Sequence, residues 1–130
     1  MKTAWILLAS LSLLSGCATA GVASRDLAGS AWRFTAIDGA APLSDKAKLT
    51  FETDRLGATV GCNGMGGGWR ISDVKLIAGP LIGTKMYCEA LDAQERAVAE
   101  LLGASPALSV NADTMTLTSA NHSASLQRAP

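Results

Sequence analysis

The sequence contains few of the residues on which catalytic and metal sites most often depend. It has one histidine and three cysteines among its 130 residues. Basic and acidic residues number eleven each, and no basic patch or run of like charge interrupts that balance. The balance argues against nucleic acid as a partner. No internal repeat is present, and we expect a monomer.

The N-terminal apolar run is too short to cross a membrane. Residues 4–14 form a stretch of eleven, whereas a spanning helix needs about 20. Lys2 precedes the run, which is the pattern of a secretory signal. The letters LSGC at residues 14–17 resemble the bacterial lipobox, so we expect a signal peptide over 1–16, a lipid on Cys17 and a tether over 17–25. The letters ATA at residues 18–20 offer an alternative cleavage site after Ala20, which would release a soluble periplasmic protein.

Removal of the signal leaves 114 residues with ten basic and eleven acidic side chains, enough for one domain over 26–130. Its two remaining cysteines, Cys62 and Cys88, are predicted to form a disulfide because an exported protein folds in an oxidising compartment. Other uses of these thiols fit less well. Redox enzymes place two cysteines in C-x-x-C, and structural zinc needs four ligands where Cys62, Cys88 and His122 supply three. A cysteine–histidine hydrolase would need a free thiol. We expect no metal and no cofactor.

The hydrophobic pattern predicts an α+β domain. Alternation of apolar and polar residues predicts short strands over 31–37, 48–52, 56–62, 69–71, 74–77, 81–86, 107–110, 115–118 and 123–127. One helix is expected to start with Asp92 as its cap, the Asp92 carboxylate accepting the Glu95 amide in a capping box, and to end at Gly103. Its apolar stripe is Ala93, Ala97, Val98, Leu101 and Leu102. We expect antiparallel hairpins that form a curved sheet or barrel closed by this helix.

The stretch VGCNGMGGGWRI at residues 60–71 raises the question of a phosphate-binding loop. It matches neither G-x-G-x-x-G nor G-x-x-x-x-G-K-[ST]. Asn63-Gly64 instead predicts a tight turn, because both residues tolerate a positive φ, and the following glycines are expected to let the backbone bend. Elsewhere, Ser72 to Lys75 matches S-x-x-K only by coincidence, because the serine falls in a predicted turn. We interpret His122 as a solvated residue of a surface turn.

Several short blocks together resemble the META domain, the domain of the HslJ-type heat-shock lipoproteins. The blocks are Leu27-x-Gly29-x-x-Trp32, Gly61-Cys62-Asn63, Gly68-Trp69 with Pro80, Thr84-x-Met86-x-Cys88, Glu95, and Thr116-Leu117. They extend over residues 27 to 128. The resemblance implies a compact, mainly antiparallel fold, an outer-membrane or periplasmic setting, and an association with heat or antibiotic (novobiocin-type) stress. It implies no catalytic mechanism.

These observations lead us to expect a non-enzymatic envelope lipoprotein, anchored by its lipid and facing the periplasm from the outer membrane. It would support stress tolerance by binding a protein or another envelope component. The alternatives are a barrel that binds a small hydrophobic ligand, and an inhibitor or accessory factor of a periplasmic enzyme. The candidate recognition residues are those of the family blocks: Gly61, Asn63, Trp69, Thr84, Met86 and Glu95.

Overall fold

The computed structural model describes residues 22–130. The predicted signal peptide, Cys17 and the alternative cleavage site lie outside this part. The elements are α1 (Ser24–Leu27), β1 (Ala31–Ile37), β2 (Lys48–Phe51), β3 (Arg55–Thr59), β4 (Gly64–Ser72), β5 (Lys75–Ala78), β6 (Ile82–Gly83), α2 (Asp92–Gly103), β7 (Ala107–Asn111), β8 (Thr114–Thr118) and β9 (Ser123–Arg128). None of the described helices is long and apolar enough to cross a membrane.

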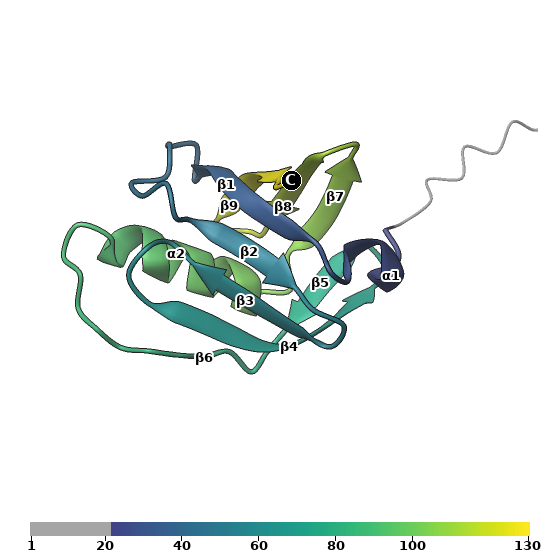
Figure 1. Ribbon diagram of the computed structural model, residues 1–130, viewed down its shortest axis with the longest axis horizontal. Coiled ribbons are helices and arrows are strands. Elements are labelled where there is room, and N and C mark those ends of the chain that lie inside the picture. Colours follow the sequence, from purple (N-terminus) through teal and green to yellow (C-terminus); the bar gives the residue numbers. More distant parts are fainter. Residues whose placement is uncertain (1–21) are drawn as a thin grey trace, which may run out of the picture.

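Eight of the strands close into an antiparallel barrel (Figure 1). The order is β1-β2-β3-β4-β5-β7-β8-β9, and β9 pairs again with β1. The long strand β4 makes closure possible, because its first half pairs with β3 and its second half with β5. The short strand β6 adds to β4 at Met65 and Gly66, outside the ring. This arrangement confirms the predicted α+β fold of antiparallel hairpins with one main helix.

Side chains fill the interior of the barrel. Alternate residues of the strands point inward, as the pleat of a strand requires, and Trp32, Leu49 and Phe51 are almost fully buried among them. Helix α2 packs against β1 and β5. Its predicted stripe is buried at Ala97, Val98, Leu101 and Leu102. Ala93, which we placed on the same stripe, is exposed.

The start of α2 differs from the sequence prediction. Asp92 is the first helical residue and Leu91 is the N-cap, with no side-chain cap. The amide of Glu95 donates to the Leu91 carbonyl at 2.9 Å, so the predicted capping box is wrong. The carboxylate of Glu95 points instead to Asn63. The prediction failed because a tertiary partner competes for the side chain that the local motif would use.

The glycine-rich stretch is mostly strand rather than turn. Residues 64–68 pair along β3, and the β3–β4 connection is the preceding segment 60–63. The predicted tight turn at Asn63-Gly64 is wrong, because Gly64 already pairs with Thr59 as the first residue of β4. The residue of this connection with a positive φ is Gly61, at +121°. The glycines of β4 serve a close approach of chains. A Cβ on Gly67 would lie 2.6 Å from the Pro80 carbonyl oxygen.

Candidate functional site

Asn63 is the centre of a polar cluster that joins three separate segments of the chain. Among the described residues 22–130, Asn63 is the one polar residue that is buried, with 4% of its surface exposed. Its Nδ2 donates to the Met86 carbonyl oxygen and to Glu95 Oε1, both at 2.6 Å. Its Oδ1 accepts from Thr84 Oγ1 at 2.7 Å and from the Met86 amide at 2.8 Å. We call Asn63, Thr84, Met86 and Glu95 the Asn63 cluster.

The hydrogen-bonding capacity of the Asn63 side chain is fully used. An amide offers two N–H donors and two acceptor lone pairs, and all four have a partner here. The Met86 backbone fixes the orientation of the amide, because its N–H can only donate and its carbonyl can only accept. Glu95 Oε2 also accepts the backbone amide of Asn63 at 3.3 Å. Neither Asp nor Leu could replace this set of bonds, which explains why an asparagine occupies the position.

A disulfide reinforces the same connection. Cys62, next to Asn63, is bonded to Cys88, two residues after Met86, with 6.3 Å between their Cα atoms. The predicted pairing of these two cysteines is therefore present. Gly61 precedes Cys62 in a conformation that favours glycine. A Cβ at that position would lie 2.6 Å from Ser44 Oγ, so Gly61 has a structural role in bringing Cys62 to its partner.

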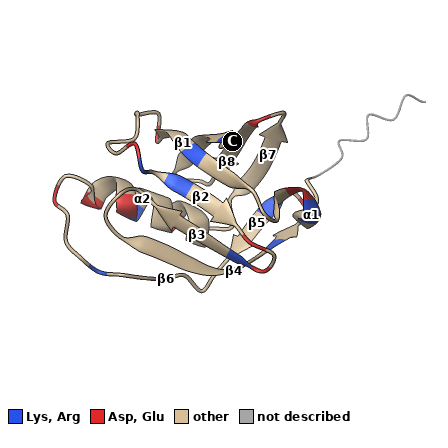
Figure 2. Cartoon of the chain, in the orientation of Figure 1, with Lys and Arg blue, Asp and Glu red and all other residues tan. Residues whose placement is uncertain are grey.

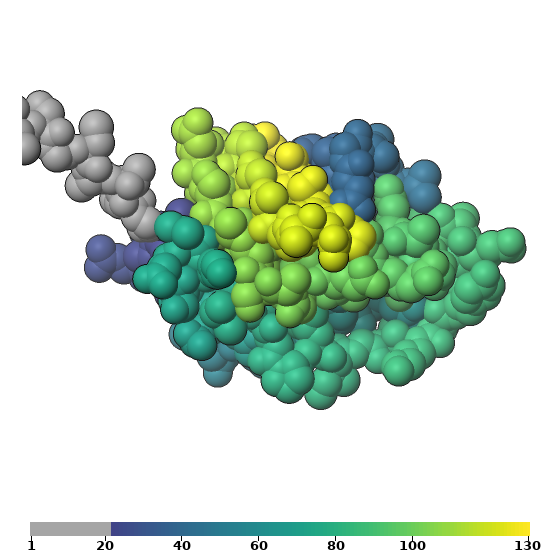
Figure 3. Space-filling view, turned by 180° about the vertical axis from the view of Figure 1, so that it is seen from behind, coloured from purple at the N-terminus to yellow at the C-terminus, as the bar shows by residue number. Residues whose placement is uncertain are grey.

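The Asn63 cluster holds an exposed apolar segment in place. The predicted strand over 81–86 is reduced to Ile82–Gly83. The Thr84 amide still donates to the Gly64 carbonyl oxygen of β4 at 3.1 Å, but the Met86 backbone bonds to the Asn63 side chain rather than to a neighbouring strand. The side chains of Ile82, Met86 and Tyr87 are 77%, 66% and 76% exposed. We call these three residues the apolar strip. The chain after β6 runs along the lower rim of the molecule when seen from behind (Figure 3).

A groove of about 490 Å³ separates this segment from helix α2. Met65, Met86 and Tyr87 line it on the strand side, and Arg96 and Ala99 line it on the helix side. An apolar strip beside a groove can accept a side chain from another molecule. The polar cluster beneath it contributes rigidity, because a buried and satisfied hydrogen-bond network holds a single geometry.

Trp69 does not belong to this surface. It is buried, and its ring packs edge-on against Phe51 with 4.9 Å between ring centroids. Its Nε1 donates to the Glu52 carbonyl oxygen at 3.0 Å. Of the six candidate recognition residues, the structure therefore brings together Asn63, Thr84, Met86 and Glu95. It places Gly61 beside them and Trp69 in the core.

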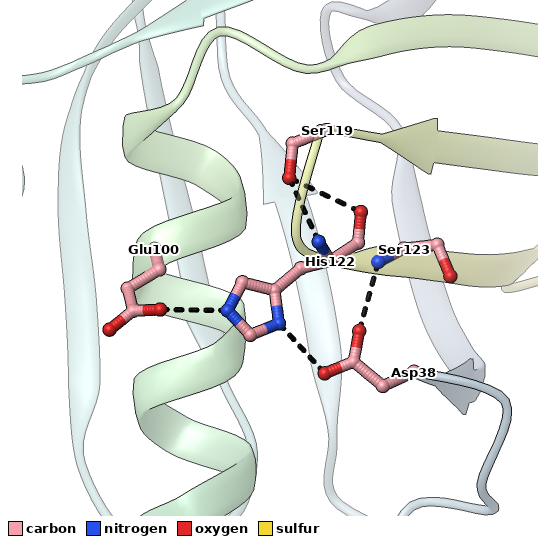
Figure 4. Close-up of polar contacts among 5 residues, drawn as sticks. All are labelled: Asp38, Glu100, Ser119, His122 and Ser123. Carbon is pink, nitrogen blue, oxygen red and sulfur yellow. Dashed lines mark hydrogen bonds and ion pairs between the residues drawn. The ribbon is translucent and has the colours of Figure 1, made fainter.

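A second polar cluster surrounds His122, which we had interpreted as simply solvated (Figure 4). Its Nδ1 lies 2.8 Å from Asp38 Oδ2 and its Nε2 lies 2.7 Å from Glu100 Oε2. Asp38 also accepts the Ser123 amide at 2.9 Å. The hydrogen bonds to Asp38 and Glu100 raise the pKa of His122 above its usual 6.5. The bonds from the Ser123 amide and from His122 lower the pKa of Asp38.

The His122 cluster, formed by Asp38, Glu100 and His122, links the end of β1, helix α2 and the β8–β9 turn by an imidazole placed between two carboxylates. Sequence reasoning missed it because its three members lie far apart in the chain and belong to no motif. In residues 22–130, no group of three or more His, Cys, Asp or Glu side chains is placed to hold a metal ion. In both clusters the observed hydrogen bonds hold separate segments of the chain together.

Comparison with known proteins agrees with the fold. A protein known from an NMR structure superposes with a TM-score of 0.73 at 22% identity, covering 82% of this chain and 94% of the other. A protein from Burkholderia xenovorans, also solved by NMR, gives a TM-score of 0.62 at 24% identity, covering 82% and 86% of the two chains. At these identities the likeness concerns the fold alone. No curated protein matches.

The family comparison is more specific than these structural likenesses. The META domain matches residues 25–130, which include the barrel, the Asn63 cluster and the disulfide. The match covers most of the chain and agrees with the resemblance carried by the sequence blocks. The chain belongs to the META domain family.

Proposed function

We propose that this protein is a non-enzymatic, HslJ-like lipoprotein of a bacterial envelope that supports tolerance of heat or antibiotic stress. It is anchored through Cys17 and binds a protein or another envelope component through the apolar strip. The membership of the META domain family supports the proposal. The lipobox-like letters at residues 14–17 support the anchor.

One observation carries the binding role. Ile82, Met86 and Tyr87 are exposed on a segment that the disulfide and three hydrogen bonds to the Asn63 side chain hold in place. Exposed apolar side chains cost solubility, and the position of Met86 and Tyr87 on one groove favours an interaction site there. A rigid segment loses little entropy when a partner binds, so more of the contact energy remains as affinity.

The filled interior of the barrel favours binding at the surface over the alternative of a barrel that sequesters a hydrophobic ligand. Trp32, Phe51 and Met115 occupy the interior together with the apolar face of α2. A ligand inside would have to displace well-packed side chains, which costs free energy. An inhibitor or accessory factor of a periplasmic enzyme would use the same surface as any other protein partner.

Two substitutions test the binding role. Met86→Ala and Tyr87→Ala remove most of the exposed apolar area while leaving the backbone bonds of Met86 to Asn63 available. Leu43→Ala is the matched control, because Leu43 is also an exposed apolar residue, at 65%, but lies in the β1–β2 connection. We expect a deletion strain of the bacterium that carries the gene to regain heat and novobiocin tolerance with the control and not with the other two.

A photo-crosslinking amino acid identifies the partner directly. Placed at position 87 in living cells, it is expected to capture an envelope component that a crosslinker at position 43 does not capture. Full tolerance with both strip variants, together with identical capture from the two positions, would remove the proposal. Incorporation of radiolabelled palmitate, lost in Cys17→Ser, separately tests the anchor.

A further inference from the structure

A second surface, on the outside of the barrel, carries two regular rows of residues. The backbone register places Arg33, Lys48, Thr59 and Gly64 in line across β1, β2, β3 and β4. The next outward row runs from Ala31 through Thr50, Gly57 and Gly66 to Ile82. Because residues two apart on a strand share a face, the two rows lie side by side on one surface.

This surface carries a net positive charge. Arg33 and Lys48 lie directly opposite each other on neighbouring strands, and both are exposed. The two blue segments stand side by side on β1 and β2 in Figure 2. Like charges at such positions destabilise a sheet. Within residues 22–130, neither of the two forms an ion pair, nor do Lys46 or Arg55.

Two contiguous grooves follow these rows. One, of about 620 Å³, is lined by Lys48, Thr50 and Arg55 with Gly57, Gly64 and Gly66 among its other residues. The other, of about 570 Å³, shares Lys48, Thr50 and Thr59 and adds Arg33, Lys46 and Asp45. The volumes are in the range of small-ligand sites. We call the two together the basic groove.

The floor of the basic groove is low because its glycines, Gly57, Gly64 and Gly66, carry no side chains. A Cβ on Gly64 would meet no atom within 4 Å, so the missing side chain there is open space above the sheet. The Arg55 guanidinium reaches over the same floor, with one nitrogen 3.8 Å from the position of a Cβ on Gly66. Cations therefore stand at both sides of the low floor: Arg33 and Lys48 on one, Arg55 on the other. The single acid among the lining residues, Asp45, lies at the Lys46 end.

We propose that the basic groove binds an anionic ligand that carries at least two phosphate or carboxylate groups. One group lies between Arg33 and Lys48 and removes their repulsion, and a second reaches Arg55 across the glycine floor. Guanidinium groups bind such anions with paired hydrogen bonds. The ligand is either a soluble molecule or the headgroup of an anionic lipid, since both present the same chemistry.

The test uses the full chain with Cys17→Ser, so that no attached lipid affects binding. Calorimetric titration with sodium tripolyphosphate at low ionic strength measures binding of a soluble polyanion, which is the first arm of the test. Co-sedimentation with phosphatidylglycerol–phosphatidylcholine vesicles, against phosphatidylcholine alone, measures the headgroup arm. Saturable binding in either arm, weakened by added salt, is the expected result, and the arm that binds more tightly identifies the source.

Three variants and two controls locate the site. Arg33→Gln and Lys48→Gln should each weaken binding about tenfold. Gly64→Val should block the groove while every charge remains, and Gly68→Val is its control, because Gly68 lies on the same strand outside the groove and its Cβ would make only an ordinary contact. Lys75→Gln on β5 controls for net charge. Urea unfolding checks that each variant folds.

The outcomes separate clearly. No saturable binding in either arm overturns the proposal, as does equal weakening by Lys75→Gln, which would indicate general attraction of anions to a cationic surface. Unchanged affinity in Gly64→Val also overturns it. Ile82 borders both proposed surfaces, but Tyr87 lies outside the basic groove. Tyr87→Ala should therefore bind tripolyphosphate like the parent chain, and either proposal can fail without the other.

Discussion

Substitution of Asn63 tests whether the Asn63 cluster holds the exposed segment in place. The Asn63→Ala variant loses four side-chain hydrogen bonds: two to the Met86 backbone, one to Thr84 and one to Glu95. Each such bond contributes about 0.5–1.5 kcal/mol net. Thr84 and Met86 are exposed residues, so water replaces part of what they lose. We therefore expect the free energy of unfolding to fall by about 2–4 kcal/mol.

The Asn63→Asp variant, alone and combined with Glu95→Gln, tests the two donor bonds of the Asn63 amide separately from its two acceptor bonds. The carboxylate keeps the oxygen that accepts from Thr84 and from the Met86 amide. It places a second oxygen against the Glu95 carboxylate, 2.6 Å from the present nitrogen. Two carboxylates at that distance repel each other, so the variant should be destabilised at pH 7. Adding Glu95→Gln restores a donor and removes one charge, and we expect it to recover about 1–2 kcal/mol.

Urea denaturation followed by tryptophan fluorescence measures these changes, and hydrogen exchange of residues 83–88 locates them. In Asn63→Ala we expect hydrogen exchange to become faster in residues 83–88 and to stay unchanged in β8 and β9. The reason is that the Asn63 cluster holds this segment and not the far side of the barrel. A loss below about 0.5 kcal/mol in Asn63→Ala, which is the range of an ordinary surface substitution, would refute the reasoning. So would additive effects of Asn63→Asp and Glu95→Gln.

Three further predictions follow from other parts of the fold. Reduction of the disulfide, which joins residues 26 apart, should lower the free energy of unfolding by roughly 3–4 kcal/mol in the chain-entropy model, as measured by urea midpoints with and without dithiothreitol. The hydrogen bonds that raise the pKa of His122 should stabilise the fold below about pH 6.5, and this stability should be lost as the pH rises through the folded-state pKa. An NMR titration of His122 measures that pKa, and His122→Gln should flatten the loss of stability. Gly67→Ala should cost about 1–3 kcal/mol because the new Cβ meets the Pro80 carbonyl, whereas Gly64→Ala should leave the melting temperature unchanged or slightly raised.

The sequence by itself determined the secondary structure over most of the barrel. Strands such as Ala31–Ile37 and Thr114–Thr118 agree with their alternating patterns, and the buried face of α2 follows the helical period from Ala97 to Leu102. These features are local, because one buried face imposes a period of 2 or 3.6 on the residues themselves. The pairing of Cys62 with Cys88 followed as well, since only two cysteines remain once Cys17 is assigned to the lipid.

Tertiary structure alone decided what the family blocks do. The blocks containing Asn63, Thr84 and Glu95 could be recognised from sequence, but their joint role depends on bonds across 21 to 32 residues. A local pattern assigned Glu95 to a helix cap and Asn63-Gly64 to a tight turn, and both assignments failed. The Glu95 carboxylate bonds to Asn63 instead, and Gly64 already belongs to β4. The alignment of Arg33 with Lys48 and the link from Asp38 through His122 to Glu100 likewise arise only when the barrel closes. Sequence period records which face of an element is buried, whereas strand register and packing decide which distant side chains meet.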